Sequence, residues 1–361
     1  MRKKIKLFEP IIGKEESKKI IQVLKSGFWA SGSGIGNVKS FEEKFQNYIG
    51  SKSCVAVNSG TAALHLALSL SDIKGKEVIL PSLSFVSTAH SIVYNGGKPI
   101  FVDVDPKTLC IDPEKVLEKI SNKTKIILPV HFAGIPANLK KLKKISKDHN
   151  LILIDDAAHA CGASYGGKKI GSINEFSCFS FHPVKNLAMP TGGLISLNHK
   201  NYKKLKKNLE SKRWCGITDR KDVKYDVKEL GWNYYMNEFS AAIGLMQLKK
   251  LDKMNKSRER ISKIYHKEIN LNNKMPIEDG SSYHFYWIRV KNRNKFMREM
   301  KNVGIETGIH YRPIHKLSLY KQKKKLVVTE NVENEIVSIP NHPNLKINDV
   351  EFIIKNINKF S

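Results

Sequence analysis

Short apolar segments alternate with amphipathic ones along the sequence between residues 54 and 197. The apolar segments predict strands at residues 54–58, 78–80, 100–104, 126–130, 151–154, 177–181 and 194–197. Apolar residues at helical spacing predict helices over 112–120 and 138–148. This alternation is typical of an α/β fold, in which helices cover both faces of a mostly parallel, mixed sheet. Functional side chains then gather at the strand ends and in the loops that follow.

The sequence before this region predicts an arm, a helix and a loop. Residues 1–14 have the character of an extended arm, and a helix over 15–26 follows, which Gly27 ends. Residues 28–37, FWASGSGIGN, have glycines at GxGxG spacing and no preceding strand. A dinucleotide-binding turn needs a longer spacing and a strand before it, so we expect a flexible loop.

The sequence after residue 230 predicts a second domain. Asn237 is the predicted N-cap of a long helix, which links two domains or lies at a subunit interface. From about residue 282 a strand-like segment is followed by helical spacing over 294–303. We therefore predict a large domain with the N-terminal arm over residues 1–240. The interdomain helix and a smaller α+β domain occupy residues 241–361.

Composition narrows the class of protein. The chain is 41% hydrophobic and 27% charged, which is ordinary for a globular protein. No apolar run approaches the roughly 20 residues that span a membrane, and the basic N-terminus lacks the apolar stretch of a signal peptide. The cysteines are odd in number, widely spaced and without a CxxC pair: Cys54, Cys110, Cys161, Cys178 and Cys215. We expect a cytoplasmic protein with reduced thiols, no metal site and no membrane association.

The net charge of +28 allows binding to nucleic acid. However, the lysines are spread along helical faces, as in KKLKKISKDH, and no nucleic-acid motif is recognisable. We therefore expect solvated lysine faces and no specific nucleic-acid partner. A basic surface also suits an anionic substrate such as a nucleotide sugar.

Lys185 has an unusual setting for a lysine of this chain. It follows the apolar run of residues 178–181, lies two residues after Pro183 and precedes the Gly192-Gly193 pair. A lysine held at the end of a buried strand is partly desolvated, which lowers the pKa of its ammonium group and favours a nucleophilic amine. Such an amine can form a Schiff base. The ordinary alternative is a surface lysine that extends from a loop into solvent.

A strand, a turn of small residues and a helix come together at residues 54–68. The turn is Ser59-Gly60-Thr61, and it directs backbone N–H groups at the positive end of the helix dipole, which favours a phosphate. Simple capping of the helix is the alternative.

Two further strand ends carry candidate site residues. Phe85 follows one strand and could stack on a planar cofactor, although a core position is its default. Asp155 and Asp156 end another strand, where buried carboxylates need partners. A protonated ring nitrogen would be a suitable partner, and capping or a local lysine is the alternative.

A phosphate cup, a carboxylate, an aromatic ring and a buried lysine together are what pyridoxal phosphate requires. With these residues in place, the sequence resembles the sugar aminotransferases of the DegT/DnrJ/EryC1/StrS family. The resemblance extends in order over nearly the whole chain, in the blocks VNSGTAALHLAL, PSLSFVSTAH, PIFVDVDPKTLCID, LPVHFAGIPAN, LIDDAAHACGASY, SFHPVKNL, GWNYYMNEFSAAIGLMQL, GIHYRPIH and SIPNHPN.

The resemblance implies a fold-type I transaminase that acts as a homodimer with shared active sites. Lys185 would hold pyridoxal phosphate as an internal aldimine, and Asp156 would keep its ring nitrogen protonated. The other implied cofactor-binding residues are Gly60, Thr61 and Ser180 at the phosphate, Phe85 on the ring, His159 near the ring hydroxyl and Asn233 from the partner subunit. His310 and Tyr311 match a motif near the sugar pocket, or else pack the small domain.

The resemblance also implies the reaction. L-glutamate would donate its amino group to a nucleotide-linked keto sugar, most simply a 4-keto-6-deoxy hexose, with Lys185 moving the proton. A 3-keto sugar, a keto-cyclitol or a non-catalytic regulatory role are the alternatives. The chain departs from many family members at Pro190-Thr191, where they carry Gly-Glu, and at Tyr235, where they carry Arg. We expect these positions to bear on substrate identity.

Overall fold

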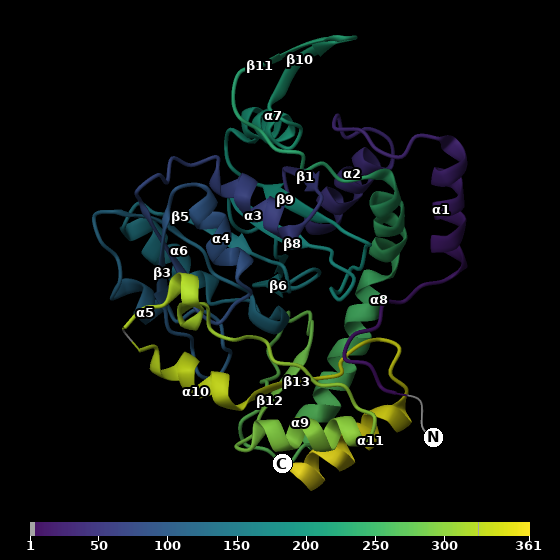
Figure 1. Cartoon of the computed structure of the whole chain (residues 1–361), viewed down its shortest axis with the longest axis vertical. Helices are drawn as coiled ribbons and strands as arrows, with labels where there is room; N and C mark the ends of the chain where they lie inside the picture. The colour runs from purple at the N-terminus through teal and green to yellow at the C-terminus, as the bar shows by residue number, and fades with distance from the viewer. Residues whose placement is uncertain (1–3, 324) are drawn as a thin grey trace.

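The computed structural model describes residues 4–323 and 325–361, and its centre is a seven-stranded sheet in the order β1-β9-β8-β5-β4-β2-β3 (Figure 1). The strands are β1 (Ser53–Val57), β2 (Glu77–Pro81), β3 (Lys98–Val102), β4 (Thr124–Ile127), β5 (Ile152–Asp156), β8 (Phe176–Ser180) and β9 (Gly193–Leu197). Neighbours from β3 to β8 are parallel, whereas β9 is antiparallel to β8 and β1. The predicted α/β class and mostly parallel, mixed sheet are confirmed, with small shifts at the strand ends.

Helices cover both faces of this sheet. They are α2 (Asn37–Ile49), α3 (Gly60–Leu68), α4 (Ser87–Tyr94), α5 (Pro113–Leu117), α6 (Leu139–Asp148) and α7 (Tyr202–Lys212). In β1, Val55 and Val57 pack in the hydrophobic cluster of α3 and α4, while Cys54 and Ala56 pack in that of α2. Successive side chains of a strand point to opposite faces, so this alternation buries both sides of the sheet. The helices α5 and α6 were predicted; α2 and α4 were not.

A long helix connects the sheet with the rest of the chain. This helix, α8 (Glu238–Glu268), begins where the Asn237 side chain accepts a hydrogen bond from the Ser240 N–H at 2.8 Å, so the predicted N-cap is confirmed. It runs from the sheet to a second lobe at its far end (Figure 1). The predicted domain boundary at residue 240 stays a prediction.

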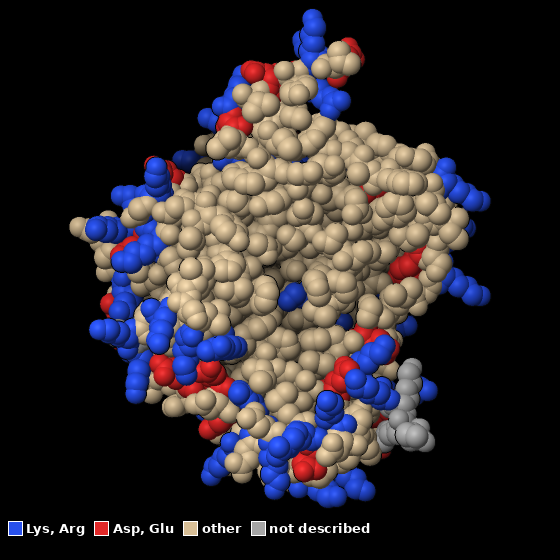
Figure 2. Space-filling view, viewed as in Figure 1, with Lys and Arg blue, Asp and Glu red and all other residues tan. Residues whose placement is uncertain are grey.

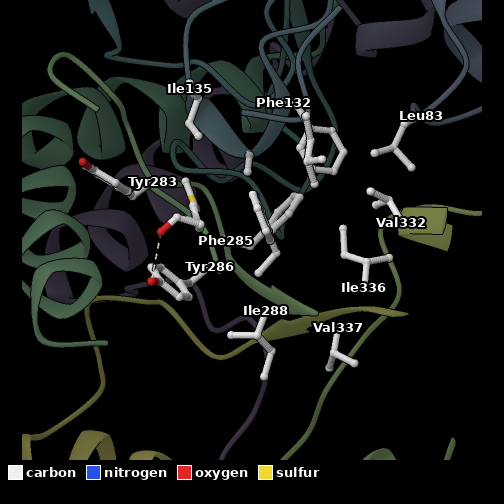
Figure 3. Packing of buried hydrophobic residues seen from close by; sticks show 14 of the residues in the cluster. Leu83, Phe132, Ile135, Tyr283, Phe285, Tyr286, Ile288, Val332, Ile336 and Val337 are labelled. Atoms are coloured by element: carbon white, nitrogen blue, oxygen red, sulfur yellow. Dashed lines mark hydrogen bonds between the residues drawn. The ribbon is translucent and has the colours of Figure 1, made fainter. Parts of the chain in front are cut away.

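The second lobe is built on a small antiparallel sheet. Its elements are β12 (Tyr286–Arg289), α9 (Arg293–Asn302), η2 (Ile314–Lys316), η3 (Ser318–Tyr320), α10 (Val327–Glu335), β13 (Ile336–Ile339) and α11 (Ile347–Phe360). Figure 3 shows how Phe285 and Ile336 from this lobe lie near Phe132 and Leu83, which belong to loops after strands of the large sheet. One continuous core therefore joins the two sheets and fixes the loops at their junction.

The N-terminal segment also contacts the second lobe. Ile5 pairs with Ile305, and the Leu7 N–H donates to a carboxylate oxygen of Glu306 at 3.0 Å. The chain then passes into α1 (Lys14–Ser26), which packs along α8. The described part of the predicted arm is residues 4–14, and of these only Lys14 is helical, as the first residue of α1; residues 1–3 lie outside the described residues.

The glycines of residues 28–37 have a packing reason that the sequence did not reveal. A Cβ atom added to Gly32 would lie 2.0 Å from the Trp214 ring, and one on Gly34 would lie 1.9 Å from the Arg213 guanidinium. A Cβ on Gly36 would lie 2.8 Å from the carboxylate of Glu238. The segment is a loop, as predicted, and its glycines allow the backbone to lie directly against these side chains.

Two short hairpins complete the fold. One consists of β6 (Ser164–Tyr165) and β7 (Lys168–Lys169), and a single-turn helix, η1 (Phe132–Gly134), precedes it. The other, β10 (Ile217–Lys221) and β11 (Lys224–Val227), projects from the body of the molecule at the end opposite the second lobe (Figure 1). The sequence did not predict this projecting hairpin.

In the described part of the chain no helix is long and apolar enough to cross a membrane.

Candidate active site

A cavity of about 290 Å³ lies where β5, β8 and the first turns of α3 and α4 meet. Among its lining residues are Ser59, Gly60, Thr61, Ser84, Phe85, Asp156, His159, Ser180, Lys185, Thr191 and Tyr311. The surface in Figure 2 is hollowed near its middle, and atoms of a basic side chain lie inside the hollow. The structure thus brings together candidates that are up to 251 residues apart in sequence, from Gly60 to Tyr311.

Lys185 lies on the loop between β8 and β9. This loop is fixed by backbone hydrogen bonds, since the Lys185 N–H donates to His182 O at 2.8 Å and the Met189 N–H donates to Phe181 O at 2.8 Å. Burial lowers the pKa of the Lys185 ammonium group to about 8, although the nearby Asp156 opposes this shift. A lysine with this pKa has a far larger neutral, nucleophilic fraction near neutral pH than an exposed lysine has.

Asp156 lines the same cavity as Lys185, and the two charges interact. Its Oδ2 accepts a hydrogen bond from the Thr88 hydroxyl at 2.8 Å, and its Oδ1 accepts one from the Ala158 N–H at 3.1 Å. Burial raises the pKa of this carboxyl group, while the bonds from Thr88 and Ala158 and the charge of Lys185 oppose the rise. An aspartate in this position can pair with a protonated ring nitrogen.

Asp155 points away from the cavity. Its carboxylate accepts hydrogen bonds from the Asn174 amide at 2.7 Å and from the Ser177 hydroxyl at 2.8 Å. The Nε2 atom of His131 is 3.6 Å from the same carboxylate. Of the two adjacent carboxylates that the sequence offered, one therefore lines the cavity and the other is satisfied within the core.

The turn between β1 and α3 forms one wall. The Ser59 side chain caps α3 by accepting a hydrogen bond from the Ala62 N–H at 3.1 Å, so Ser59 acts as a cap and Gly60 and Thr61 open the first turn. A Cβ atom on Gly60 would lie 2.7 Å from that of Ser180, and one on Gly193 would lie 2.2 Å from the Ser59 carbonyl oxygen. The glycines therefore allow β8 and β9 to pack directly against this turn, and the first turn of α3 lines the cavity with its positive end, which favours an anion.

Aromatic and imidazole groups also line the cavity. Phe85 is 56% exposed at the cavity, so its default reading as a core residue is wrong. Its ring centroid is 5.9 Å from that of Tyr311, whose hydroxyl is 3.0 Å from His159 Nε2. His159 is buried, which lowers the pKa of its imidazole well below the usual value, and no residue of the described chain satisfies its Nδ1. This arrangement is suited to a bound aromatic molecule with polar substituents.

The structure does not bring His310 and Asn233 to the cavity. The His310 ring stacks on Phe285 with centroids 4.8 Å apart, and its Nδ1 is 2.8 Å from the Ser338 hydroxyl. His310 thus packs within the second lobe, while its neighbour Tyr311 reaches the cavity. Asn233 is exposed near the base of the projecting hairpin, where its carbonyl accepts a hydrogen bond from the Asn58 amide at 3.3 Å.

Sequence reasoning missed Ser84, Thr88 and Asn186. The spacing of Ser84 and Thr88, four residues apart at a helix start, could have indicated that they share a face. Asn186 follows the lysine directly; it is buried, and its side-chain amide donates hydrogen bonds to Asn255 and Ser282. No local signal identifies these distant partners.

The comparison with known proteins fits this geometry. Residues 10–358 match the model of the DegT/DnrJ/EryC1/StrS aminotransferase family. The chain belongs to this family.

Three relatives of this DegT-family chain illustrate its similarity to known proteins. The spore coat polysaccharide biosynthesis protein SpsC of Bacillus subtilis is 34% identical over 96% of this chain and 94% of its own. The structure of Helicobacter pylori PseC, an aminotransferase involved in the biosynthesis of pseudoaminic acid, superposes with a TM-score of 0.93 over 99% of both chains at 28% identity. The PLP-form of Streptococcus pneumoniae Spr1654 superposes with a TM-score of 0.92 over 99% of this chain and 98% of its own, at 26% identity.

The DegT-family chain is a transaminase, and pyridoxal phosphate is its cofactor. The residues present fit this group: the cavity holds a desolvated amine, a buried carboxylate, an unsatisfied imidazole nitrogen and a glycine-opened helix start. The predicted family, fold type and cofactor are therefore confirmed. The individual roles of the site residues remain predictions that this geometry supports.

Proposed function

We propose that the protein transfers the amino group of L-glutamate to a nucleotide-linked keto sugar, with a 4-keto-6-deoxy hexose as the first choice. The observation that carries the proposal is that Lys185 and Asp156 line one cavity and interact electrostatically there. The names of SpsC and PseC, which refer to polysaccharide and pseudoaminic acid biosynthesis, support a sugar acceptor. A 3-keto sugar and a keto-cyclitol are alternative acceptors.

The residues of the cavity divide the chemical work. When bound, pyridoxal phosphate supplies a carbonyl carbon that accepts the amino group and a ring that takes up electron density. Lys185 would hold the cofactor through Nζ and would carry the proton taken from the donor's α carbon. Asp156 would hold a proton on the ring nitrogen, and Phe85 would cover the ring and exclude water.

The wall made by α3 binds the phosphate. Gly60 and Thr61 offer the helix start, and the Ser180 hydroxyl lies beside Gly60. His159, neutral because of its burial, is available as a hydrogen-bond partner for the ring hydroxyl. These residues would hold the cofactor in the cavity that Lys185 lines.

A second copy of the chain completes the site in this proposal. A cavity of about 290 Å³ is at the lower limit for small-molecule sites of ~300–1,000 Å³, so a nucleotide sugar needs further walls. The projecting hairpin exposes apolar side chains, with Val223 88% exposed and Tyr225 60% exposed. In Figure 2 the middle of this face carries few charged groups, while Lys and Arg gather toward its margins. Such an arm and surface suit a homodimer in which Asn233 reaches the partner's cofactor.

The reaction is tested in two half-reactions with purified protein. We expect L-glutamate to convert the cofactor of the wild type to its amino form and to release 2-oxoglutarate. The amino form is then offered a panel of nucleotide-linked 4-keto-6-deoxy hexoses, 3-keto sugars and keto-cyclitols, and the cofactor spectrum reports which acceptor restores the carbonyl form. Conversion by glutamate without restoration by any acceptor would favour the regulatory alternative.

Shared sites are tested by mixing two inactive variants, Lys185→Ala and Asn233→Ala. If Asn233 serves the partner's cavity, a mixed dimer contains one intact site, so random reassociation restores about a quarter of wild-type activity. If both residues serve the same cavity, mixing restores nothing. Sedimentation equilibrium of the wild type checks the dimer itself, and a monomer would contradict the proposal.

We also propose that the protein works in the cytoplasm. All five cysteine thiols are unpaired, and four of them are buried, which suits a reducing compartment.

A further inference from the structure

Two hydroxyl groups connect the cavity wall with Asp156. The Thr88 Oγ1 donates to Asp156 Oδ2 at 2.8 Å, and the Ser84 Oγ is 2.8 Å from the Thr88 Oγ1. A hydroxyl carries a single proton. Because the proton of Thr88 is used at Asp156, Ser84 must be the donor to Thr88. The two hydrogen bonds therefore run in one direction: Ser84 donates to Thr88, and Thr88 donates to the carboxylate of Asp156.

The two hydroxyl groups of this hydrogen-bond chain are buried. Thr88 is 0% exposed and Ser84 is 4% exposed. Thr88 lies in the first turn of α4, Ser84 lies in the bend after β2, and Asp156 ends β5. The hydroxyls therefore come from elements other than the strand of the carboxylate, and they approach one of its oxygen atoms while the Ala158 N–H holds the other.

The hydrogen bond from Thr88 counteracts the tendency of the buried Asp156 carboxylate to become protonated. A buried carboxyl group tends to take up a proton, and burial is the main cause that raises the pKa of Asp156. The hydrogen bond from Thr88 is the largest opposing effect. The other titratable groups that act on Asp156 or respond to its charge come from different elements: Lys185, His131, Cys178 and Tyr311.

We propose that Ser84 and Thr88 are positioning residues that keep Asp156 ionised, so that the shared proton stays on the ring nitrogen of the cofactor. A carboxylate that loses its donor becomes a stronger base and draws the proton toward itself. A ring without that proton takes up less electron density, which slows the removal of the donor's α proton. The proposal rests on the cofactor and is independent of the identity of the sugar.

The decisive variant is Thr88→Val, which keeps the shape of the side chain and removes its hydroxyl. Thr88→Ser keeps the hydroxyl and is the matched control. The first measurement is the absorbance of the bound, Lys185-linked cofactor as a function of pH. A positive ring nitrogen disfavours a second positive charge on the linkage, so loss of the ring proton lets the protonated linkage persist to higher pH.

We expect the midpoint of this titration to rise by about one pH unit in Thr88→Val and to stay at the wild-type value in Thr88→Ser. The kcat of the glutamate half-reaction falls about tenfold in Thr88→Val with KM nearly unchanged, since substrate binding is not altered. Ser84→Ala, which removes the outer donor without touching Asp156, gives a smaller shift in the same direction.

Unchanged titrations in both Thr88→Val and Ser84→Ala would overturn the proposal. If Thr88→Val does not fold, the Ser84→Ala variant decides the question. A titration midpoint equal to that of the wild type in Ser84→Ala would contradict the proposed effect of the two hydroxyl groups on Asp156. If the wild type aminates no keto sugar, the proposed acceptor is wrong, but these spectra can still be interpreted because they depend only on the cofactor.

Discussion

Asp155 and Asp156 are neighbours on β5, yet their carboxylates point to opposite sides of the central sheet. Asp156 reaches the cavity and Thr88, whereas Asp155 bonds to Asn174 and Ser177 in the core. Successive residues of a strand face opposite ways, so this division follows from the register of β5 with β8.

Changing each aspartate to Asn should therefore affect different properties: Asp156→Asn the catalytic rate, and Asp155→Asn the stability. We expect Asp156→Asn to fold and to bind pyridoxal phosphate, but to lose at least on the order of 10²-fold in kcat, because the ring nitrogen loses its charged partner. Asp155→Asn should instead lower the free energy of unfolding by about 1–3 kcal/mol, because its amide group faces other donors. Urea unfolding and glutamate half-reaction rates, measured on both variants, separate the roles. Equal loss of activity in folded samples of both would contradict the division.

Lys185 should react at an unusually low pH. With a pKa of about 8, its amine is half neutral near pH 8. The rate at which the apo protein attaches pyridoxal phosphate should rise with pH through this value. Asp156 stabilises the ammonium form, so Asp156→Asn should move the midpoint to lower pH. A midpoint near about 10.4, as for an exposed lysine, would show that Lys185 is not desolvated.

Asn186 should hold the lysine loop in place. Its amide nitrogen donates to Asn255 Oδ1 at 2.9 Å and to Ser282 O at 2.8 Å, and its Oδ1 is 3.0 Å from His284 Nδ1. We expect Asn186→Ala to lower the free energy of unfolding by about 1–3 kcal/mol, because it leaves buried partners unsatisfied. It should also slow attachment of the cofactor.

A second buried asparagine is the control for this variant. The Asn356 amide donates to Phe352 O at 2.8 Å within α11. Asn356→Ala should reduce stability without changing the attachment rate. If both variants slow attachment equally at matched stability, Asn186 has no particular effect on the lysine.

Glu42 and Arg213 form a buried ion pair with 2.5 Å between Oε1 and Nη1. Glu42 also accepts a hydrogen bond from the Ala56 N–H of β1 at 2.7 Å, so the pair joins α2 to the edge of the sheet. We expect Glu42→Ala to cost about 3–5 kcal/mol in the free energy of unfolding, because Arg213 would remain buried and unpaired. Denaturant unfolding at fixed protein and cofactor concentration measures this.

An exposed pair provides the comparison. Lys144 and Asp148 are one turn apart on α6, and their side chains are 82% and 52% exposed. Asp148→Ala should change the free energy of unfolding by less than about 1 kcal/mol. A similar cost for Glu42→Ala would show that the buried pair is compensated by water or by repacking.

Features that depend on short stretches of chain could be predicted from the sequence. The turn Ser59-Gly60-Thr61 is such a feature, because a strand, a turn and a helix start within a dozen residues form the cup on their own. The N-cap Asn237 is another, since it bonds three residues ahead. The seven strands followed from their apolar runs for the same reason.

Features that depend on packing could not be predicted in this way. Phe85 is an aromatic residue of the kind usually found in a core, and it is exposed because the segment before α4 lies at the cavity. His310 and Tyr311 are adjacent in a single motif, but one packs on Phe285 and the other lines the cavity. The projecting hairpin mixes charged residues with Val223, Tyr225 and Val227, and nothing local distinguishes it from a loop.

The sequence by itself determined the fold class, the family and the chemistry, because apolar periodicity and the residues of the cup, carboxylate and lysine are properties of the chain. The tertiary structure decided how these residues act together. Asp156 lines the same cavity as Lys185 only because β5 pairs with β8, with Asp156 beside Cys178. The two hydroxyl groups reach Asp156 only because the bend after β2 and the first turn of α4 lie beside the end of β5. Strand order and helix packing set these distances, and both arise from long-range burial that no short segment encodes.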